Sequence, residues 1–464
     1  MSHSNPEIAG PAALTRRSTP IVTLSERSES KGREVEGRLG LSLVALAFVA
    51  GCGALQPATG VPGQARADRT RSASSYSVLY RFANRVHAGR RRFHGGYGPL
   101  APLIDVDGTL FGTTFYGGYH PCSGGCGTVY GISKSGAHTV LYRFDGGSDG
   151  ASPWAGLLDV NTTLYGTTYS GGGSTYDYSG TLYSVTTSGV ASVLHRFTGG
   201  SGGANPVAGL AAVAGTLYGT TLYGGTASEC LARQYGCGTV YSISSEGAFQ
   251  VLYRFEGGSD GAGPAARLID VHGTLYGTTE GGGDTSCGST EGCGTVYSVS
   301  RSGKEKVLHR FSGGSDGRHP QSGLIDVNGT LYGTTAAGGA FDEGTVYSIT
   351  ATGTENVVYS FAGGSDGARP TAGLIDVKGL LYGTTSQGGG GECYSGSGCG
   401  TIYSVTPTGS ENVLHSFGGA PDGAVPQAEL TNVRGTLYGT TAYGGGGTCV
   451  GAERGCGTVF SLTP

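Results

Sequence analysis

Five aspartates recur at one position of a repeated motif, and a ring of carboxylates could hold Ca²⁺. The motif is G-G-S-D-G or a close variant, and its aspartates are Asp149, Asp260, Asp316, Asp366 and Asp422. Ca²⁺ needs about six to eight oxygen ligands, yet no second carboxylate recurs beside these residues. An aspartate before glycine also commonly accepts hydrogen bonds from its own turn. We therefore expect turn residues, and we assign no metal and no cofactor.

The same motif formally matches the G-x-S-x-G signature of serine hydrolases. That signature requires a turn between a strand and a helix, whereas here the motif recurs in several copies and joins two β-type runs. The sequence has neither the H-E-x-x-H metal motif nor the phosphate-binding G-x-x-x-x-G-K-[ST] motif. The recurrent histidines His195, His309 and His415 alternate with Tyr at one position, which indicates a packing role. We assign no catalytic residue.

Ten of the eleven cysteines lie in pairs that are close together in the sequence. Each pair falls in the segment of variable length within one copy of a sequence repeat that is described below. The pairs are Cys122/Cys126, Cys230/Cys237, Cys287/Cys293, Cys393/Cys399 and Cys449/Cys456. Two repeats lack both members, and none lacks only one. This all-or-none occurrence predicts five local disulfides, and the absence of a recurrent nearby His argues against zinc. Disulfides imply an oxidising compartment.

Four short strings repeat along the chain. They are L-I-D-V, T-L-Y-G-T-T, T-V-Y-S-I-S and V-L-Y-R-F, and each is rich in strand-forming residues and bounded by Gly. The first two are separated by pairs such as Asp107-Gly108 and Asn328-Gly329, which suit a type I′ hairpin. The repeat is thus a four-stranded antiparallel meander, and such units form β-propellers.

The order of the strings predicts how the ring closes. A lone fourth strand at residues 77–82 precedes six complete units, and the chain then ends on three strands. Pairing the lone strand with the last unit closes seven blades and removes two exposed sheet edges. We therefore predict an all-β, seven-bladed propeller over residues 76–464. Residues 1–52 are expected to be an N-terminal extension with a signal peptide, and residues 53–75 a flexible linker.

Composition agrees with this fold class. The chain has 92 Gly among 464 residues without a collagen period, and only 13% charged residues. A formal charge of −4 provides no excess of positive charge for binding nucleic acid. We expect a monomer that does not bind nucleic acid.

The repeat consensus, G-G-S-D-G-A-x-P-x-A-G-L-I-D-V-x-G-T-L-Y-G-T-T, resembles the GloVer tandem repeat, a bacterial extracytoplasmic family with varied surface anchors. The resemblance extends over residues 76–464 and implies location rather than activity. A weaker similarity is to kelch and galactose-oxidase-like propellers. The chain lacks their usual Trp, because its only Trp, Trp154, lies in the segment before a first strand.

A lipoprotein-type signal precedes the repeats. Residues 39–50 are apolar, follow two arginines, and are too short to span a bilayer. They lead into V-A-G-C, which resembles a lipobox and makes Cys52 the predicted lipidation site. An ordinary signal peptide cleaved near Ala50 is the alternative. We expect an outer-membrane or cell-surface lipoprotein, or otherwise a periplasmic or secreted protein, with the lipid as its only membrane contact.

One face of the propeller is the predicted binding surface. In a meander the tight turns lie at one end of each blade, while the variable loops and the G-G-S-D-G links lie at the other. Variable loops on a rigid frame commonly bind ligands, and this face carries Tyr116, Tyr169 and Tyr223 as well as the link aspartates. We predict a non-catalytic binding or scaffold module for a polysaccharide or a protein. The alternative is an extracellular carbohydrate-active enzyme with its site on the same loops.

Overall fold

The computed structural model describes residues 74–464, except 84–85, 88–89, 92–94, 120–121, 174–178, 226–229, 231–235, 245, 288–291, 394–395, 448 and 450–454. The expected signal peptide, Cys52 and most of the linker lie outside the described residues. Among the described residues, no helix is both long and apolar enough to cross a membrane.

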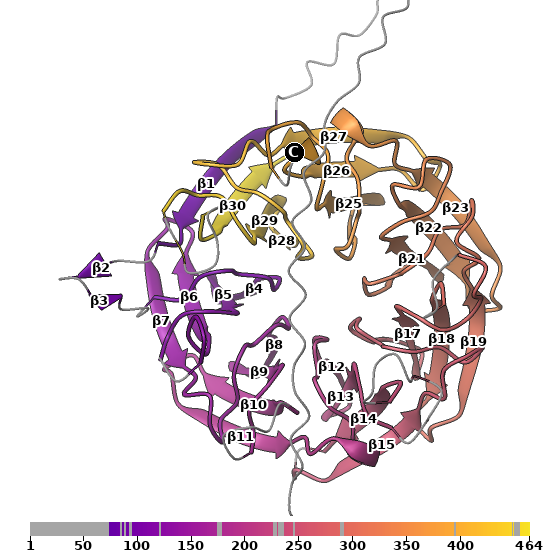
Figure 1. Ribbon diagram of the computed structural model, residues 1–464, viewed down its shortest axis with the longest axis horizontal. Helices are drawn as coiled ribbons and strands as arrows, with labels where there is room; N and C mark the ends of the chain where they lie inside the picture. The colour runs from indigo at the N-terminus through magenta and orange to yellow at the C-terminus, as the bar shows by residue number, and fades with distance from the viewer. Residues whose placement is uncertain are drawn as a thin grey trace, which may run out of the picture. The chain divides into compact units, whose positions relative to one another are not determined.

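Seven four-stranded antiparallel sheets form a ring (Figure 1), which confirms the predicted propeller. We number these blades 1–7 in chain order.
Blade 1 contains β4 (Ile104–Val106), β5 (Thr109–Thr114), β6 (Thr128–Ser133) and β7 (His138–Arg143). Blade 2 contains β8 (Leu158–Val160), β9 (Thr163–Thr168), β10 (Thr181–Thr186) and β11 (Ala191–Arg196). Blade 3 contains β12 (Ala211–Val213), β13 (Thr216–Thr221), β14 (Thr239–Ile243) and β15 (Phe249–Arg254). Blade 4 contains β16 (Ile269–Val271), β17 (Thr274–Thr279), β18 (Thr295–Ser300) and β19 (Glu305–Arg310).

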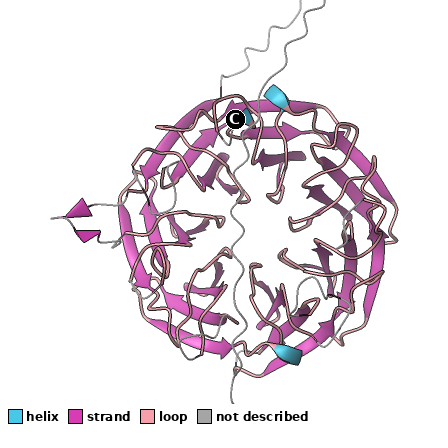
Figure 2. Ribbon diagram, in the orientation of Figure 1, coloured by secondary structure: helices cyan, strands magenta, loops and turns pink. Residues whose placement is uncertain are grey.

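The remaining blades repeat this order. Blade 5 contains β20 (Ile325–Val327), β21 (Thr330–Thr335), β22 (Thr345–Thr350) and β23 (Glu355–Ser360). Blade 6 contains β24 (Ile375–Val377), β25 (Leu380–Thr385), β26 (Thr401–Val405) and β27 (Glu411–Ser416). Blade 7 contains β28 (Thr431–Val433), β29 (Thr436–Thr441), β30 (Thr458–Thr463) and β1 (Ser75–Arg81). Outside the blades lie the short pair β2 (Val86–His87) and β3 (Arg90–Arg91), and the 3₁₀ helices η1 (Gly200–Gly202) and η3 (Gly364–Asp366) (Figure 2).

The first strand of each blade is the innermost, and six of the seven neighbouring pairs of first strands, all except β16 and β20, are in close contact around the centre. The tight turn after each first strand has the predicted geometry, because Asp107 and Gly108 have φ of 51° and 85°. Positive φ at both central residues defines a type I′ turn.

Each blade is packed around an aromatic residue of its third strand. Six of these are fully buried tyrosines, such as Tyr297, while blade 7 has Phe460. The hydroxyl end of the tyrosine lies against the Gly of T-L-Y-G-T-T: a Cβ added at Gly277 would lie 2.6 Å from the Tyr297 hydroxyl oxygen. The repeated Gly is therefore required by close approach of the aromatic ring.

The ring closes through β1, as predicted. β1 pairs with β30 from Ser75↔Thr463 to Arg81↔Thr458, so the strand begins two residues earlier than expected and ends at Arg81. β1 also makes the contact with the preceding link that an ordinary fourth strand makes. Arg81 Nε donates to the Pro421 carbonyl at 2.8 Å, just as Arg196 Nε donates to the Ser148 carbonyl at 2.9 Å.

Candidate binding site

The variable loops and the links between blades lie on the same face, which we call the loop face. Backbone bridges join each link to the loop that follows a second strand, for example Ala151↔Ser170 and Ala204↔Tyr223. Gly313 of a link also lies against Cys287 of a variable loop. The structure therefore places both kinds of segment together, where the sequence led us to expect a binding surface.

All five predicted disulfides are present within the variable loops. They join Cys122–Cys126, Cys230–Cys237, Cys287–Cys293, Cys393–Cys399 and Cys449–Cys456. The second cysteine of every pair is fully buried beneath its loop. Each disulfide therefore fastens a variable loop to the rigid end of its blade.

The link aspartates fold their own links. Each accepts a hydrogen bond from the backbone N–H four residues earlier; for Asp260 this donor is Glu256, at 2.7 Å. The other oxygen of Asp260 accepts from the Tyr253 hydroxyl at 2.8 Å. In blade 6 the equivalent pair is His415 Nε2 and Asp422 Oδ2, 3.1 Å apart. The carboxylates are thus engaged by the turn and by the fourth strand, which explains why Tyr and His alternate there.

Three glutamates extend this arrangement into the seams between blades. Glu305, Glu355 and Glu411 begin fourth strands and are half-buried. Burial raises the pKa of each to about 7, and the link aspartate of the preceding seam (Asp260, Asp316 or Asp366) adds to the rise. These carboxyl pairs were not anticipated, although Glu at the start of three successive fourth strands was visible in the sequence.

The three tyrosines predicted on the binding surface have different roles. Tyr116 stacks on Tyr97 with a centroid distance of 5.1 Å, and the Tyr223 backbone pairs with a link. Tyr169 alone of the three lines a cavity at the centre of the ring. The predicted surface residues are therefore spread around the loop face, and they do not form one cluster.

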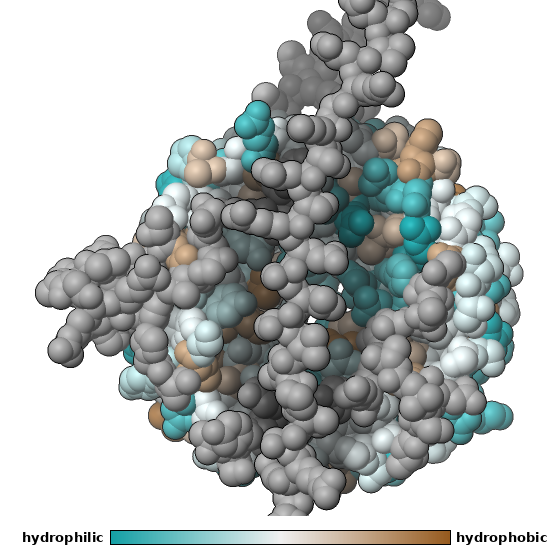
Figure 3. All heavy atoms as spheres, viewed as in Figure 1, coloured by the Kyte–Doolittle hydropathy of each residue, from teal (hydrophilic) through white to brown (hydrophobic). Residues whose placement is uncertain are grey.

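The centre of the ring is hollowed (Figure 3), and seven equivalent positions surround its opening on the loop face. The motif P-x-A-G-L, or a variant of it, lies directly before each first strand, and these residues occupy its position x. They are Leu100, Trp154, Val207, Ala265, Gln321, Thr371 and Gln427. The cavity that they line has a volume of about 340 Å³. We call it the channel mouth.

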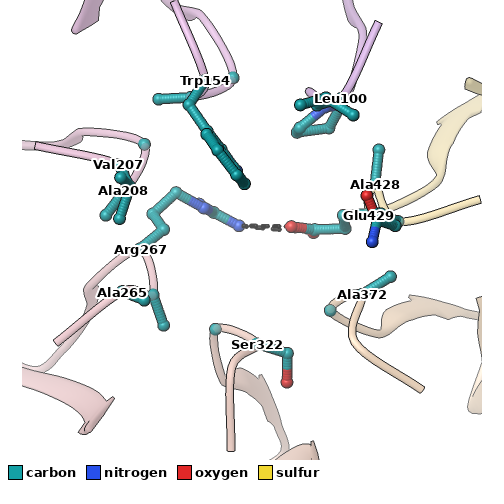
Figure 4. A pocket seen from close by; sticks show the side chains of 18 of the residues that line it. Leu100, Trp154, Val207, Ala208, Ala265, Arg267, Ser322, Ala372, Ala428 and Glu429 are labelled. Atoms are coloured by element: carbon teal, nitrogen blue, oxygen red, sulfur yellow. Dashed lines mark hydrogen bonds and ion pairs between the residues drawn. The ribbon is translucent and has the colours of Figure 1, made fainter. Parts of the chain in front are cut away.

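An ion pair crosses the channel below the mouth. Four blades have Gly two residues after position x and blade 1 has Pro102, but blade 4 has Arg267 and blade 7 has Glu429. Arg267 Nη2 lies 3.4 Å from Glu429 Oε1 (Figure 4). The small neighbours make room for them, since a Cβ added at Gly209 would lie 3.3 Å from Arg267 Cδ, and one at Gly373 would lie 3.3 Å from Glu429 Oε2.

The mouth has one aromatic wall. Trp154 is 43% exposed, and its side chain points into the cavity (Figure 4). Phe115 meets its ring edge-on at 5.3 Å, and Tyr169 lies 6.2 Å away. On the side of blades 4 and 5, Gln321 Nε2 donates to Glu280 Oε1 at 2.9 Å. A bound molecule would therefore meet aromatic surface on one side and amide and carboxylate groups on another.

The residues of the mouth were missed by sequence reasoning because position x was treated as merely variable. Aligning the seven P-x-A-G-L strings would have shown the single Trp, and would have shown Arg267 and Glu429 replacing Gly. Across the described ranges, no three His, Cys, Asp or Glu side chains cluster closely enough to hold a metal ion.

Comparison with solved structures finds several enzymes at low similarity. A gluconolactonase from Xanthomonas campestris is 13% identical, with a TM-score of 0.38, over 84% of this chain and 89% of that one. An aldose sugar dehydrogenase from Streptomyces coelicolor is 12% identical, with a TM-score of 0.39, over 84% and 98%. The chain spans only 28% of the tricorn protease that it also matches. These values carry no conclusion about activity, and no curated protein matches the chain.

The repeat itself is recognised by a family model. The model describes the Gloeobacter/Verrucomicrobia repeat and matches residues 69–290 and 232–396, which together cover most of the propeller. The match agrees with the seven equivalent blades and with the consensus from which the resemblance was first inferred. The chain therefore belongs to the Gloeobacter/Verrucomicrobia repeat family.

Proposed function

We propose that the protein is a non-catalytic extracytoplasmic module, anchored at a surface, which binds a polysaccharide on its loop face. The observation that carries the proposal is the channel mouth. Seven equivalent positions surround one cavity, yet they hold six different residue types within an otherwise repeated frame. A concave site with apolar walls and a few polar groups is the usual form of a ligand pocket.

The contacts of the carboxylates at the channel mouth, below it and in the links support binding rather than catalysis. A general acid or base must be able to exchange its proton with the substrate. Here Glu429 pairs with Arg267, Glu280 accepts from Gln321, and the link aspartates fold their own turns. These groups are thus held by the protein's own contacts.

Five disulfides support an extracytoplasmic location, because disulfides persist in oxidising compartments. The V-A-G-C sequence ending at Cys52 supports the lipid anchor. Cys52→Ser should move the protein from the membrane fraction to the soluble fraction. Persistence of the variant in the membrane fraction would contradict the anchor without touching the binding proposal.

The binding proposal is tested by applying the purified full chain to an array of polysaccharides and to immobilised proteins. We expect saturable binding to one class of polysaccharide without release of reducing ends. Release of reducing ends from the bound polymer would favour the alternative, a carbohydrate-active enzyme, with Glu280 and Glu429 as the carboxylates to substitute first. Saturable binding to proteins alone would overturn the polysaccharide assignment.

A further inference from the structure

The residues of the channel mouth are sorted by polarity around the ring. Blades 1–4 contribute Leu100, Trp154, Val207 and Ala265, whereas blades 5–7 contribute Gln321, Thr371 and Gln427. Since consecutive blades are neighbours in the ring, the mouth has one continuous apolar arc and one continuous polar arc. A ligand that fills it must have an apolar face and polar groups on its other side.

Trp154 gives the apolar arc a flat surface of defined orientation. Phe115 abuts its ring at an interplanar angle of 88°, so one edge of the indole is fixed. Trp154 remains 43% exposed, and it lines the cavity. Flat aromatic surface with restricted side-chain freedom is well suited to stacking, because little conformational entropy is lost when a ligand binds.

The floor of the mouth limits both the depth and the charge of a ligand. Arg267 and Glu429 line the deeper of two adjoining cavities but not the outer one, and their ion pair spans the channel between blades 4 and 7. The paired charges leave no net charge at the floor. A volume of about 340 Å³ lies at the small end of ligand pockets, so it suits the end of a chain better than a long stretch of polymer.

From these features we infer that the channel mouth binds the terminal sugar of a neutral polysaccharide, with the polymer leading away from the loop face. A pyranose ring has C–H groups on its face and hydroxyl groups around its edge. Its face lies on Trp154, and its hydroxyls exchange hydrogen bonds with Gln321, Thr371 and Gln427. This inference rests on the proposed polysaccharide-binding function and adds its site, its orientation and the charge class of its ligand.

Trp154 supplies its own assay, because it is the only Trp in the chain. The full chain is titrated with short neutral oligosaccharides (gluco-, xylo- and manno-configured) and with oligouronates of matched length, and Trp fluorescence is recorded. We expect saturable fluorescence changes with a neutral sugar and much weaker binding of the oligouronates. Stronger binding of oligouronates would overturn the neutral assignment.

Calorimetry with the best neutral sugar then compares three variants. Trp154→Ala should weaken binding by about tenfold or more, as expected for an aromatic anchor. Gln427→Ala should weaken it by about three- to tenfold through the loss of a hydrogen bond. Phe341→Ala is the matched control: Phe341 is 61% exposed and lines neither cavity, so binding should be unchanged. Thermal unfolding verifies that all three variants fold.

The outcomes separate the inference from the function on which it rests. Polysaccharide binding that survives Trp154→Ala unchanged, with no change in wild-type Trp fluorescence, would overturn the site and leave the binding function standing. Absence of binding to every polysaccharide would overturn both.

Discussion

The contribution of ring closure to the free energy of unfolding can be measured by comparing Phe82 with Phe255, the equivalent residue of another blade. Phe82 follows β1 and is 1% exposed; its ring meets Tyr80 at 5.0 Å and Tyr130 of blade 1 at 5.3 Å. Phe255 occupies the same position after β15, is fully buried, and meets Tyr297 of the next blade at 5.0 Å. If the N-terminal strand is a full member of blade 7, the two phenylalanines are energetically equivalent.

Truncating a fully buried Phe to Ala costs about 3–5 kcal/mol, because the transfer free energy is lost and a cavity remains. We expect this cost for Phe82→Ala and, within about 1 kcal/mol, for Phe255→Ala. With an unfolding entropy of about 2.1 cal/mol/K per residue, a ring of about 390 residues should show a fall in Tm of about 4–6 °C for each variant.

Differential scanning calorimetry of the wild type and of the two variants makes the comparison. The equivalence of the two phenylalanines would be excluded if Phe255→Ala showed the full loss while Phe82→Ala cost less than about 1 kcal/mol. That result would mean that the N-terminal strand contributes little to the stability of the closed ring.

Four further predictions concern stability and covalent structure. Burial raises the pKa of Glu305, Glu355 and Glu411 to about 7, above the ordinary value of 4.5. Their contribution to folding stability is therefore full below about pH 4.5 and lost as the pH rises through about 7. The triple Glu→Gln variant should raise Tm relative to the wild type near pH 8.5 but not near pH 5, and an equal shift at both would contradict this. Tyr297→Phe should be neutral or stabilising by up to about 1 kcal/mol in denaturant unfolding, since its buried hydroxyl has no hydrogen-bond partner within the described residues; a loss above about 1 kcal/mol would show a missing partner. Asp316→Ala should cost about 1–2 kcal/mol by removing the bond from the Ser312 N–H, and EDTA should leave Tm unchanged; a Ca²⁺-dependent rise in Tm that the variant lacks would restore the calcium site. Non-reducing peptide mapping should find the five disulfides within their loops, and a link between blades would exclude this pairing.

The fold could be predicted from the sequence because the strand-forming motifs and the turn residues between them repeat in the same order in each unit. Each hairpin carries its own turn signal, as at Asp107-Gly108, and the paired cysteines occur only within variable loops. The order of the repeated sequence motifs indicated how the ring closes. An unpaired first strand and an incomplete last unit each leave an exposed sheet edge, and the two edges can pair with each other. These features depend on local geometry and on backbone hydrogen bonding, which short strings encode.

The site was harder to predict from the sequence because residues of several different blades form it. Arg267 and Glu429 are separated by 162 residues, and only the curvature of the ring brings them together. Trp154 was noticed as the single Trp, but its exposure at the channel mouth depends on how the link enters the first strand. The raised pKa of each seam glutamate likewise comes first from burial between blades and then from an aspartate of the preceding link. Sequence spacing shows neither the burial nor the neighbouring aspartate.

Polysaccharide binding at the channel mouth of the loop face is the function that we propose for this protein. A crystal structure of the full chain with the neutral oligosaccharide selected by titration tests it most directly. We expect density for a terminal sugar stacked on Trp154, within hydrogen-bond distance of Gln321, Thr371 or Gln427. Sugar density confined to the variable loops away from the channel, with an empty mouth, would contradict it.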